Sequence, residues 1–256
     1  MTVSNVEFVD TALQLVDDAD SQGIRLRILG SLAFRLHCPE NIELFDKMQR
    51  DLTDVDFAAA SAQHKPIQKY LEGLGYEMDR DIQAATEGTR WFFEHPETGL
   101  GIDVFFNELF FCHKIPFKGR LELDSPTIPL ADLMLEKMQI VEINPKDVKD
   151  TLVLLLEHPI AAGDREAIDG TYIAKLLGDD WGFYYTVTTN LGKLRTLGLE
   201  YGALDEGQWA VVKERIEQLE QLIEDEPKSR GWKLRARIGT HKQWYQEVAE
   251  KSATFS

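Results

Sequence analysis

Three aspartates stand in short apolar runs of this sequence. Asp54 and Asp56 flank Val55 in the run 53–57, and Asp103 lies in the run 101–105. Because alternate side chains of a β-strand share a face, Asp54 and Asp56 are expected to point the same way. Two like charges there repel, and their burial costs on the order of several kcal/mol unless a cation neutralises them. Mg²⁺ favours one or two carboxylates together with substrate phosphates, so the pattern predicts metal-dependent phosphate chemistry with Asp103 as a third ligand.

A glycine–serine pair precedes these aspartates. Gly30 and Ser31 follow the alternating run 24–29, which is typical of a strand, and a helical pattern begins at Leu32. Glycine permits close approach of a backbone, and a serine at a helix N-terminus offers hydrogen-bond donors to phosphate oxygens. Ser31 as a plain helix N-cap is compatible with that function and is not separable from it by sequence.

The elements that must position these residues alternate between helix and strand in the first half of the chain. A hairpin is expected around the turn 96–99, with Asp103 on its second strand. Helices and strands mixed in this way predict an α+β fold with a mixed sheet rather than a repeating βαβ array. The expected helices are 6–19, 32–37 and 66–74, and the expected strands are 24–29, 52–58, 90–95 and 100–107.

After Pro129 the pattern becomes helical. We place a domain boundary near residue 125, which divides the chain into a mixed domain, 1–125, and a helical domain, 126–256. The aromatic run 181–185 is expected to be helical core rather than a platform for stacking bases. The expected helices of this half are 130–140, 146–157, 165–177, 181–197, 206–225 and 241–251.

Composition fits a globular enzyme of the cytoplasm. The chain has 256 residues, 43% of them hydrophobic, and a formal charge of −16, which argues against non-specific nucleic-acid binding over the whole surface. No secretory signal pattern opens the chain, and the apolar run 152–156 is far too short to cross a membrane. Cys38 and Cys112 lack the spacing of a metal site and are expected to be buried or half-buried thiols.

Charge is distributed unevenly in the helical half. Four glutamates lie three or four residues apart on one predicted helix face, which is typical of a solvated surface: Glu214, Glu217, Glu220 and Glu224. The segment 228–242 follows, in which basic residues surround Trp232 and no acidic residue occurs. This segment could hold a phosphate backbone or an anionic partner, or it could pair with the acidic helix.

The order of these motifs resembles the DNA polymerase β nucleotidyltransferase superfamily. The run 50–57, Arg-Asp-Leu-Thr-Asp-Val-Asp-Phe, is similar to the Arg-x-Ser/Thr-x-Asp-φ-Asp-φ element (φ, apolar) of its abortive-infection (AbiEii-type) branch. The run 130–137 followed by 146–150 is similar to that branch's helix lysine and its basic-Asp-x-x-Asp element. The resemblance covers about residues 24–157, and two departures stand out: an insertion at 39–49, which could form a flap or an acceptor contact, and Lys146 in place of arginine.

The resemblance implies that the first domain is a nucleotidyltransferase catalytic domain that uses Mg²⁺ and a nucleoside triphosphate such as ATP. Asp54, Asp56 and Asp103 would be the catalytic metal ligands. The nucleotide-binding residues would be Gly30, Ser31, Lys137 and Asp147, with Asp150 a weaker candidate. Ordinary alternatives remain for three of these: Lys137 as an exposed helix lysine, and Asp147 and Asp150 as simple charges at a helix N-terminus.

The acceptor is not fixed by the sequence. The resemblance allows RNA, a protein hydroxyl or a small hydroxylated molecule such as an aminoglycoside, and it implies a possible toxin-like activity with an antitoxin partner. The overall acidity suits a cationic small molecule, whereas the segment 228–242 suits RNA. A different class of function is also compatible: a module that senses a nucleoside triphosphate or binds a partner and has lost turnover.

Overall fold

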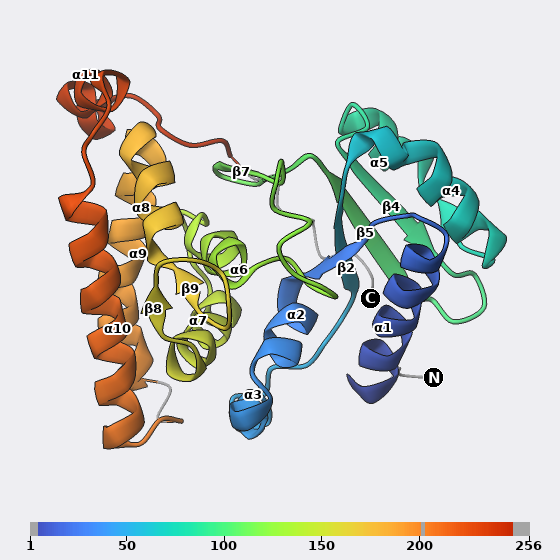
Figure 1. The fold of residues 1–256 in the computed structure, drawn as a ribbon, viewed down its shortest axis with the longest axis horizontal. Helices are drawn as coiled ribbons and strands as arrows, with labels where there is room; N and C mark the ends of the chain where they lie inside the picture. Colours follow the sequence, from blue (N-terminus) through green and yellow to red (C-terminus); the bar gives the residue numbers. More distant parts are fainter. Residues whose placement is uncertain (1–4, 201–202, 248–256) are drawn as a thin grey trace.

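A computed structural model of the chain describes residues 5–200 and 203–247. It shows an α+β fold, which confirms the predicted class: a mixed sheet lies on one side of the molecule and a group of helices on the other (Figure 1). Helices α2 (Gly30–His37) and α6 (Leu130–Met138) pack against each other between these two parts. The division at residue 125 into separately folding domains stays a prediction.

The central sheet has five strands in the order β1-β2-β5-β4-β3. Its two middle strands, β2 (Val55–Ala59) and β5 (Gly101–Phe106), run parallel, and every other pairing in the sheet is antiparallel. Both faces of these two strands are covered by the rest of the protein, and most of their residues are accordingly apolar and buried. The outer strands are β1 (Arg27–Leu29), β4 (Arg90–Glu94) and β3 (Glu77–Met78).

The segment 126–128, which joins the two halves of the molecule, returns to the central sheet at β1. Ile28 of β1 accepts from Ile128 N at 3.0 Å and donates to Pro126 O at 2.9 Å, so the segment 126–128 lies beside β1. Helices α1 (Asn5–Ser21), α4 (His64–Gly73) and α5 (Arg80–Ala85) lie with the sheet on the right of Figure 1. Two short hairpin strands, β6 (Glu108–Phe110) and β7 (Lys114–Pro116), follow β5.

The remaining helices form the second half of the molecule. Helix α7 contacts α6, α9 and α10, and α8 contacts α9 and α10. Their mutual faces are filled by buried leucine, isoleucine and valine residues. The bounds are α7 (Pro145–Glu157), α8 (Gly170–Asp179), α9 (Trp181–Glu200), α10 (Glu206–Asp225) and α11 (Arg230–Ile238), with a small pair of strands, β8 (Ile160–Ala161) and β9 (Ile168–Asp169).

Two predicted helices are wrong in part. Helix α8 begins only at Gly170, where the Asp169 side chain accepts from Tyr172 N at 3.0 Å, so 165–169 are loop and strand rather than helix. Residues 242–247 are irregular, with bends, rather than helical, and the rest of the predicted helix 241–251, apart from residue 241, lies outside the described residues. The basic segment instead forms α11, which starts at an N-cap serine, Ser229.

The insertion 39–49 is a pair of short helical turns, including α3 (Ile42–Lys47), that pack against α7. Leu44 and Phe45 are buried there, and Glu157 at the end of α7 accepts from Asn41 N at 3.0 Å. Apolar burial therefore holds the insertion against α7, and its function as a flap or an acceptor contact stays a prediction.

A buried ion cluster fastens the chain near the junction of the two halves. Arg120 donates to Asp132 on α6 at 2.9 Å and forms two bonds, each 2.9 Å, to Asp164 in the β8–β9 loop. Its guanidinium lies 3.8 Å from the ring centre of Tyr172 on α8. Planar guanidinium groups suit such bidentate, stacked arrangements, so Arg120 is placed to hold three segments together.

Both cysteines are buried and free, as the sequence predicts. Among the described residues, no helix combines the length and the apolar character that a bilayer crossing requires.

Candidate functional site

The parallel pairing of β2 with β5 brings the three aspartates together. Asp56 lies directly opposite Asp103 in the register, and Asp54 immediately precedes β2. One carboxylate oxygen from each lies within 4.8 Å of the others. Val55 and Phe57, which alternate with them, are fully buried on the opposite face. The structure therefore places the aspartates together on the side of the sheet that faces away from this core.

An arginine that sequence reasoning missed holds the third aspartate. Arg90 begins β4, next to β5, and its Nε donates to Asp103 Oδ1 at 2.6 Å. Its guanidinium also lies 5.4 Å from the ring centre of Phe105, two residues along the same face as Asp103. Cross-strand placement explains the pair, and a lone arginine at a strand start carries no local sequence signal for it.

Gly30 occupies a position that only glycine fits. Its φ is +72°, and an added Cβ would lie 2.3 Å from Asp56 Oδ2. The close backbone approach expected of Gly30 is thus made to the Asp56 carboxylate. Its N–H donates to Glu136 Oε2 at 3.1 Å, so in this conformation that donor is engaged within the protein. Ser31 is the second residue of α2 and lines the cavity; the N-cap position belongs to Leu29, so the N-cap interpretation of Ser31 is wrong.

Lys137 is a buried lysine, which excludes the exposed-lysine alternative. Its Nζ lies 2.8 Å from Glu136 Oε1 and 3.6 Å from Asp150 Oδ2, and the residue is 8% exposed. Burial lowers the pKa of this lysine, but the carboxylates of Glu136, Asp150 and Asp147 outweigh burial and raise it. Lys137 is therefore a fixed positive charge in the wall of the site.

Arg50 and Asp150 form a buried ion pair behind Lys137. Arg50 Nε and its second terminal nitrogen reach the two Asp150 oxygens at 2.9 and 3.0 Å, and Asp150 is fully buried. Asp150 is consequently no simple helix-end charge. It connects the segment before β2 to helix α7.

Asp147 lies at the N-terminus of helix α7, as the alternative of a helix-end charge predicted. It forms a capping box with Asn144, whose side chain accepts from Asp147 N at 3.1 Å. Burial raises its pKa, and the nearby Lys137 partly offsets that effect. Asp147 lines a neighbouring cavity rather than the one that holds the aspartates, whereas the exposed Lys146 lines the latter.

These residues surround a cavity of about 370 Å³, within the size range of small-molecule sites. Phe105 and Phe111 form its apolar wall and stack edge to face with ring centres 5.6 Å apart. Its charged lining divides into four carboxylates, Asp54, Asp56, Asp103 and Glu136, and four cations, Arg50, Arg90, Lys137 and Lys146.

The carboxylates perturb one another. Burial, followed by the charges of Asp54, Asp103 and Glu136, raises the pKa of Asp56 well above its usual range, and Lys137 opposes this only in part. A divalent cation would relieve this repulsion and favour the deprotonated form of Asp56.

The donor set fits a hard cation. Three carboxylates supply oxygen ligands, and the cluster contains no histidine or cysteine, which suits Mg²⁺ better than a softer metal. Asp54, Asp56 and Asp103 are the residues that would hold it.

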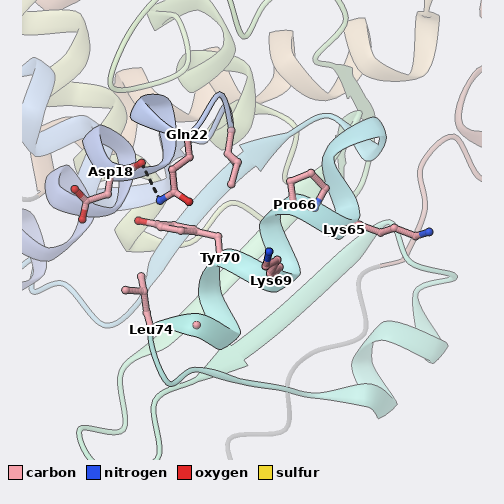
Figure 2. Close-up of a pocket in the computed structure, with 9 residues that line it drawn as sticks. Asp18, Gln22, Lys65, Pro66, Lys69, Tyr70 and Leu74 are labelled. Carbon is pink, nitrogen blue, oxygen red and sulfur yellow. Dashed lines mark hydrogen bonds between the residues drawn. The ribbon is translucent and has the colours of Figure 1, made fainter.

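A larger hollow elsewhere on the surface contains none of these residues. It lies between the end of α1 and helix α4 and measures about 630 Å³. Figure 2 shows Asp18 and Gln22 facing Tyr70 across it, with Lys65 turned outward. Burial and the Asp18 charge raise the pKa of Tyr70 to about 12, and its hydroxyl donates to Leu15 O at 3.0 Å. These contacts tie α4 to α1 and bring no catalytic group together.

The basic segment meets the acidic helix through Lys228, whose Nζ donates to the backbone carbonyls of Ile223 and Glu224 at the end of α10. Within the described parts of the chain, Arg230, Lys233 and Arg237 of α11 form no ion pair and are exposed. Arg235 instead donates to Gly239 O and Lys242 O at 2.7 Å each, so it closes the end of α11. The aromatic run at the start of α9 is helical core, as predicted, because Trp181 and Phe183 are buried.

No known protein-family profile matches this chain, and no curated protein matches its sequence. Among solved structures, it is similar to the crystal structure of an antigenic nucleotidyltransferase-like protein from Paracoccidioides brasiliensis. The two chains are 15% identical, the match covers 89% of this chain and 96% of that one, and the TM-score is 0.42.

Proposed function

We propose that this protein is a Mg²⁺-dependent nucleotidyltransferase that moves a nucleoside monophosphate from a nucleoside triphosphate to a hydroxyl acceptor. One observation carries the proposal: the aspartate cluster, with oxygens within 4.8 Å of one another, shares a cavity with four cationic side chains. A cation bound to carboxylates, facing positive charges, is the environment that a polyphosphate requires.

In the proposed reaction, an acceptor oxygen forms a bond to the α-phosphorus while the bond to the pyrophosphate oxygen breaks. A bound metal would neutralise phosphate oxygens and acidify the acceptor hydroxyl, whose proton would pass to a carboxylate of the aspartate cluster. Lys137 and Lys146 would bind the departing phosphates, and Ser31 would offer its hydroxyl and amide at the start of α2. Arg90 would keep Asp103 turned toward the cluster, and the phenylalanine wall would exclude water.

The acceptor class remains open within this proposal. The exposed cations of α11, which form no ion pair within the described residues, support an RNA acceptor, and the net charge of −16 supports a cationic small molecule. The resemblance to the AbiEii-type branch rests on the runs 50–57 and 130–150, and a toxin-like activity with an antitoxin partner in the cytoplasm is part of the proposal on that ground alone.

The experiment is a transfer assay with α-labelled nucleoside triphosphates, Mg²⁺ and a panel of RNA, protein and amino-sugar acceptors. Wild type should release pyrophosphate and label an acceptor, and Asp56→Ala should do neither. Asp51→Asn is a matched control, because Asp51 precedes the cluster by three residues and is exposed. Binding of the triphosphate without transfer to any acceptor would favour a nucleotide sensor, and absence of binding would reject both functions.

A further inference from the structure

Glu136 is a buried carboxylate that the sequence patterns did not single out. It lies on α6 and is 5% exposed. Its two oxygens have different partners: Oε2 accepts from Gly30 N at 3.1 Å, and Oε1 lies 2.8 Å from Lys137 Nζ. One side chain thus joins the turn before α2 to the lysine of α6.

The partners of Glu136 are themselves fixed by the rest of the site. Gly30 packs so closely on Asp56 that an added Cβ would lie 2.3 Å from its carboxylate. Lys137 also faces Asp150, which holds Arg50. A continuous series of contacts therefore runs from the aspartate cluster through Gly30 and Glu136 to helix α7.

We propose that Glu136 is a positioning residue for phosphate binding, an inference that rests on the proposed nucleotidyltransferase function. It holds the Gly30–Ser31 turn and the Lys137 ammonium at a fixed separation before the nucleotide arrives. Groups held in the bound geometry lose little entropy on binding, so this arrangement strengthens triphosphate binding. It also gives a buried lysine the counter-charge that burial requires.

Glu136 could instead compete with the nucleotide, and in that case its removal would strengthen nucleotide binding. A carboxylate bonded to an amide at a helix N-terminus and to a lysine imitates a phosphate oxygen, so Glu136 could compete with the nucleotide. The contact with Lys137 favours positioning, because the ammonium is buried and the Glu136 carboxylate, 2.8 Å away on the same helix, supplies its counter-charge.

Calorimetric titration of a non-hydrolysable ATP analogue with Mg²⁺ into wild type and Glu136→Gln separates these functions. The glutamine keeps an oxygen for Gly30 N but loses the charge for Lys137. We expect the variant to bind the analogue about tenfold more weakly. Its affinity for adenosine, which lacks the phosphates, should stay unchanged, which a general loss of structure would not allow. Glu142→Gln, an exposed change in the loop after α6, should match wild type.

Each result decides between the possibilities. Unchanged or tighter binding by Glu136→Gln overturns the positioning function, and tighter binding establishes competition. If wild type fails to bind the analogue, the proposed function itself is wrong, and this is seen before any variant is measured. If the glutamine variant does not fold, Glu136→Asp keeps the charge but shortens its reach from Gly30, and it must also bind the analogue more weakly.

Discussion

Asp56→Asn should stabilise the metal-free protein and remove its response to divalent cations. The side chain lies among carboxylates whose oxygens approach within 4.8 Å. At an effective dielectric of about 20, two unit charges at that distance repel by about 3.5 kcal/mol. Protonation of Asp56 removes this repulsion, and burial together with the neighbouring carboxylates shifts its pKa upward, in favour of the protonated form. We therefore expect asparagine to raise the free energy of unfolding by about 1–2 kcal/mol near neutral pH.

The pH dependence of the stability follows from the raised pKa of Asp56. A carboxyl whose pKa is raised in the folded state binds more protons folded than unfolded, so the stability of wild type falls as pH rises from the ordinary carboxyl range toward the raised pKa. Asparagine does not titrate. The stability advantage of Asp56→Asn should consequently grow as pH rises above the ordinary carboxyl range.

Thermal unfolding in EDTA and in excess Mg²⁺ tests both parts. For a chain of this length, about 1 kcal/mol shifts the melting temperature by roughly 2–4 °C. Wild type should melt higher with Mg²⁺, by an amount equivalent to about 2.7 kcal/mol at a hundredfold excess over its Kd, and Asp56→Asn should show no Mg²⁺ shift. The exposed control Asp51→Asn should behave as wild type. A variant that melts lower in EDTA, or keeps the Mg²⁺ shift, would refute the reasoning.

Three further changes probe other parts of the site. Arg50→Lys loses the two-pronged contact with the buried Asp150, and urea titration should show a loss of about 3 kcal/mol in unfolding free energy; a loss below about 1 kcal/mol would mean the pair contributes little. Gly30→Ala places a Cβ 2.3 Å from Asp56 Oδ2 at a positive φ, so the Mg²⁺-induced shift in melting temperature should vanish, and a retained shift would show that the turn adjusts. Replacing the three exposed cations of α11, Arg230, Lys233 and Arg237, by glutamine should remove salt-dependent binding of RNA in fluorescence anisotropy. Unaffected binding would mean that α11 does not support an RNA acceptor.

The sequence predicts the part of the site that depends on strand alternation. Asp54 and Asp56 share a face because a strand repeats every two residues, and Asp103 was found because an aspartate is conspicuous in an apolar strand. The direct opposition of Asp56 and Asp103 required the parallel register of β2 and β5, which no local pattern specifies.

The residues that were missed depend on contacts between distant segments. Glu136 resembles an ordinary surface glutamate of a helix, and only the packing of α6 against α2 reveals that it is buried. Arg50 belonged to a recognised motif, yet its partner lies 100 residues away. The helix predicted at 165–177 began too early because the polar segment before Gly170 forms a short strand pair instead.

The segment 126–128 has a consequence for self-association. A sheet usually exposes unpaired backbone groups at its edge strands, where another chain can add a strand and aggregate. Here the outward N–H and C=O of Ile28 are both occupied, by Pro126 O and Ile128 N. The opposite edge strand, β3, has only two residues. Over the described part of the chain, both edges of the central sheet therefore resist the addition of a strand from another chain.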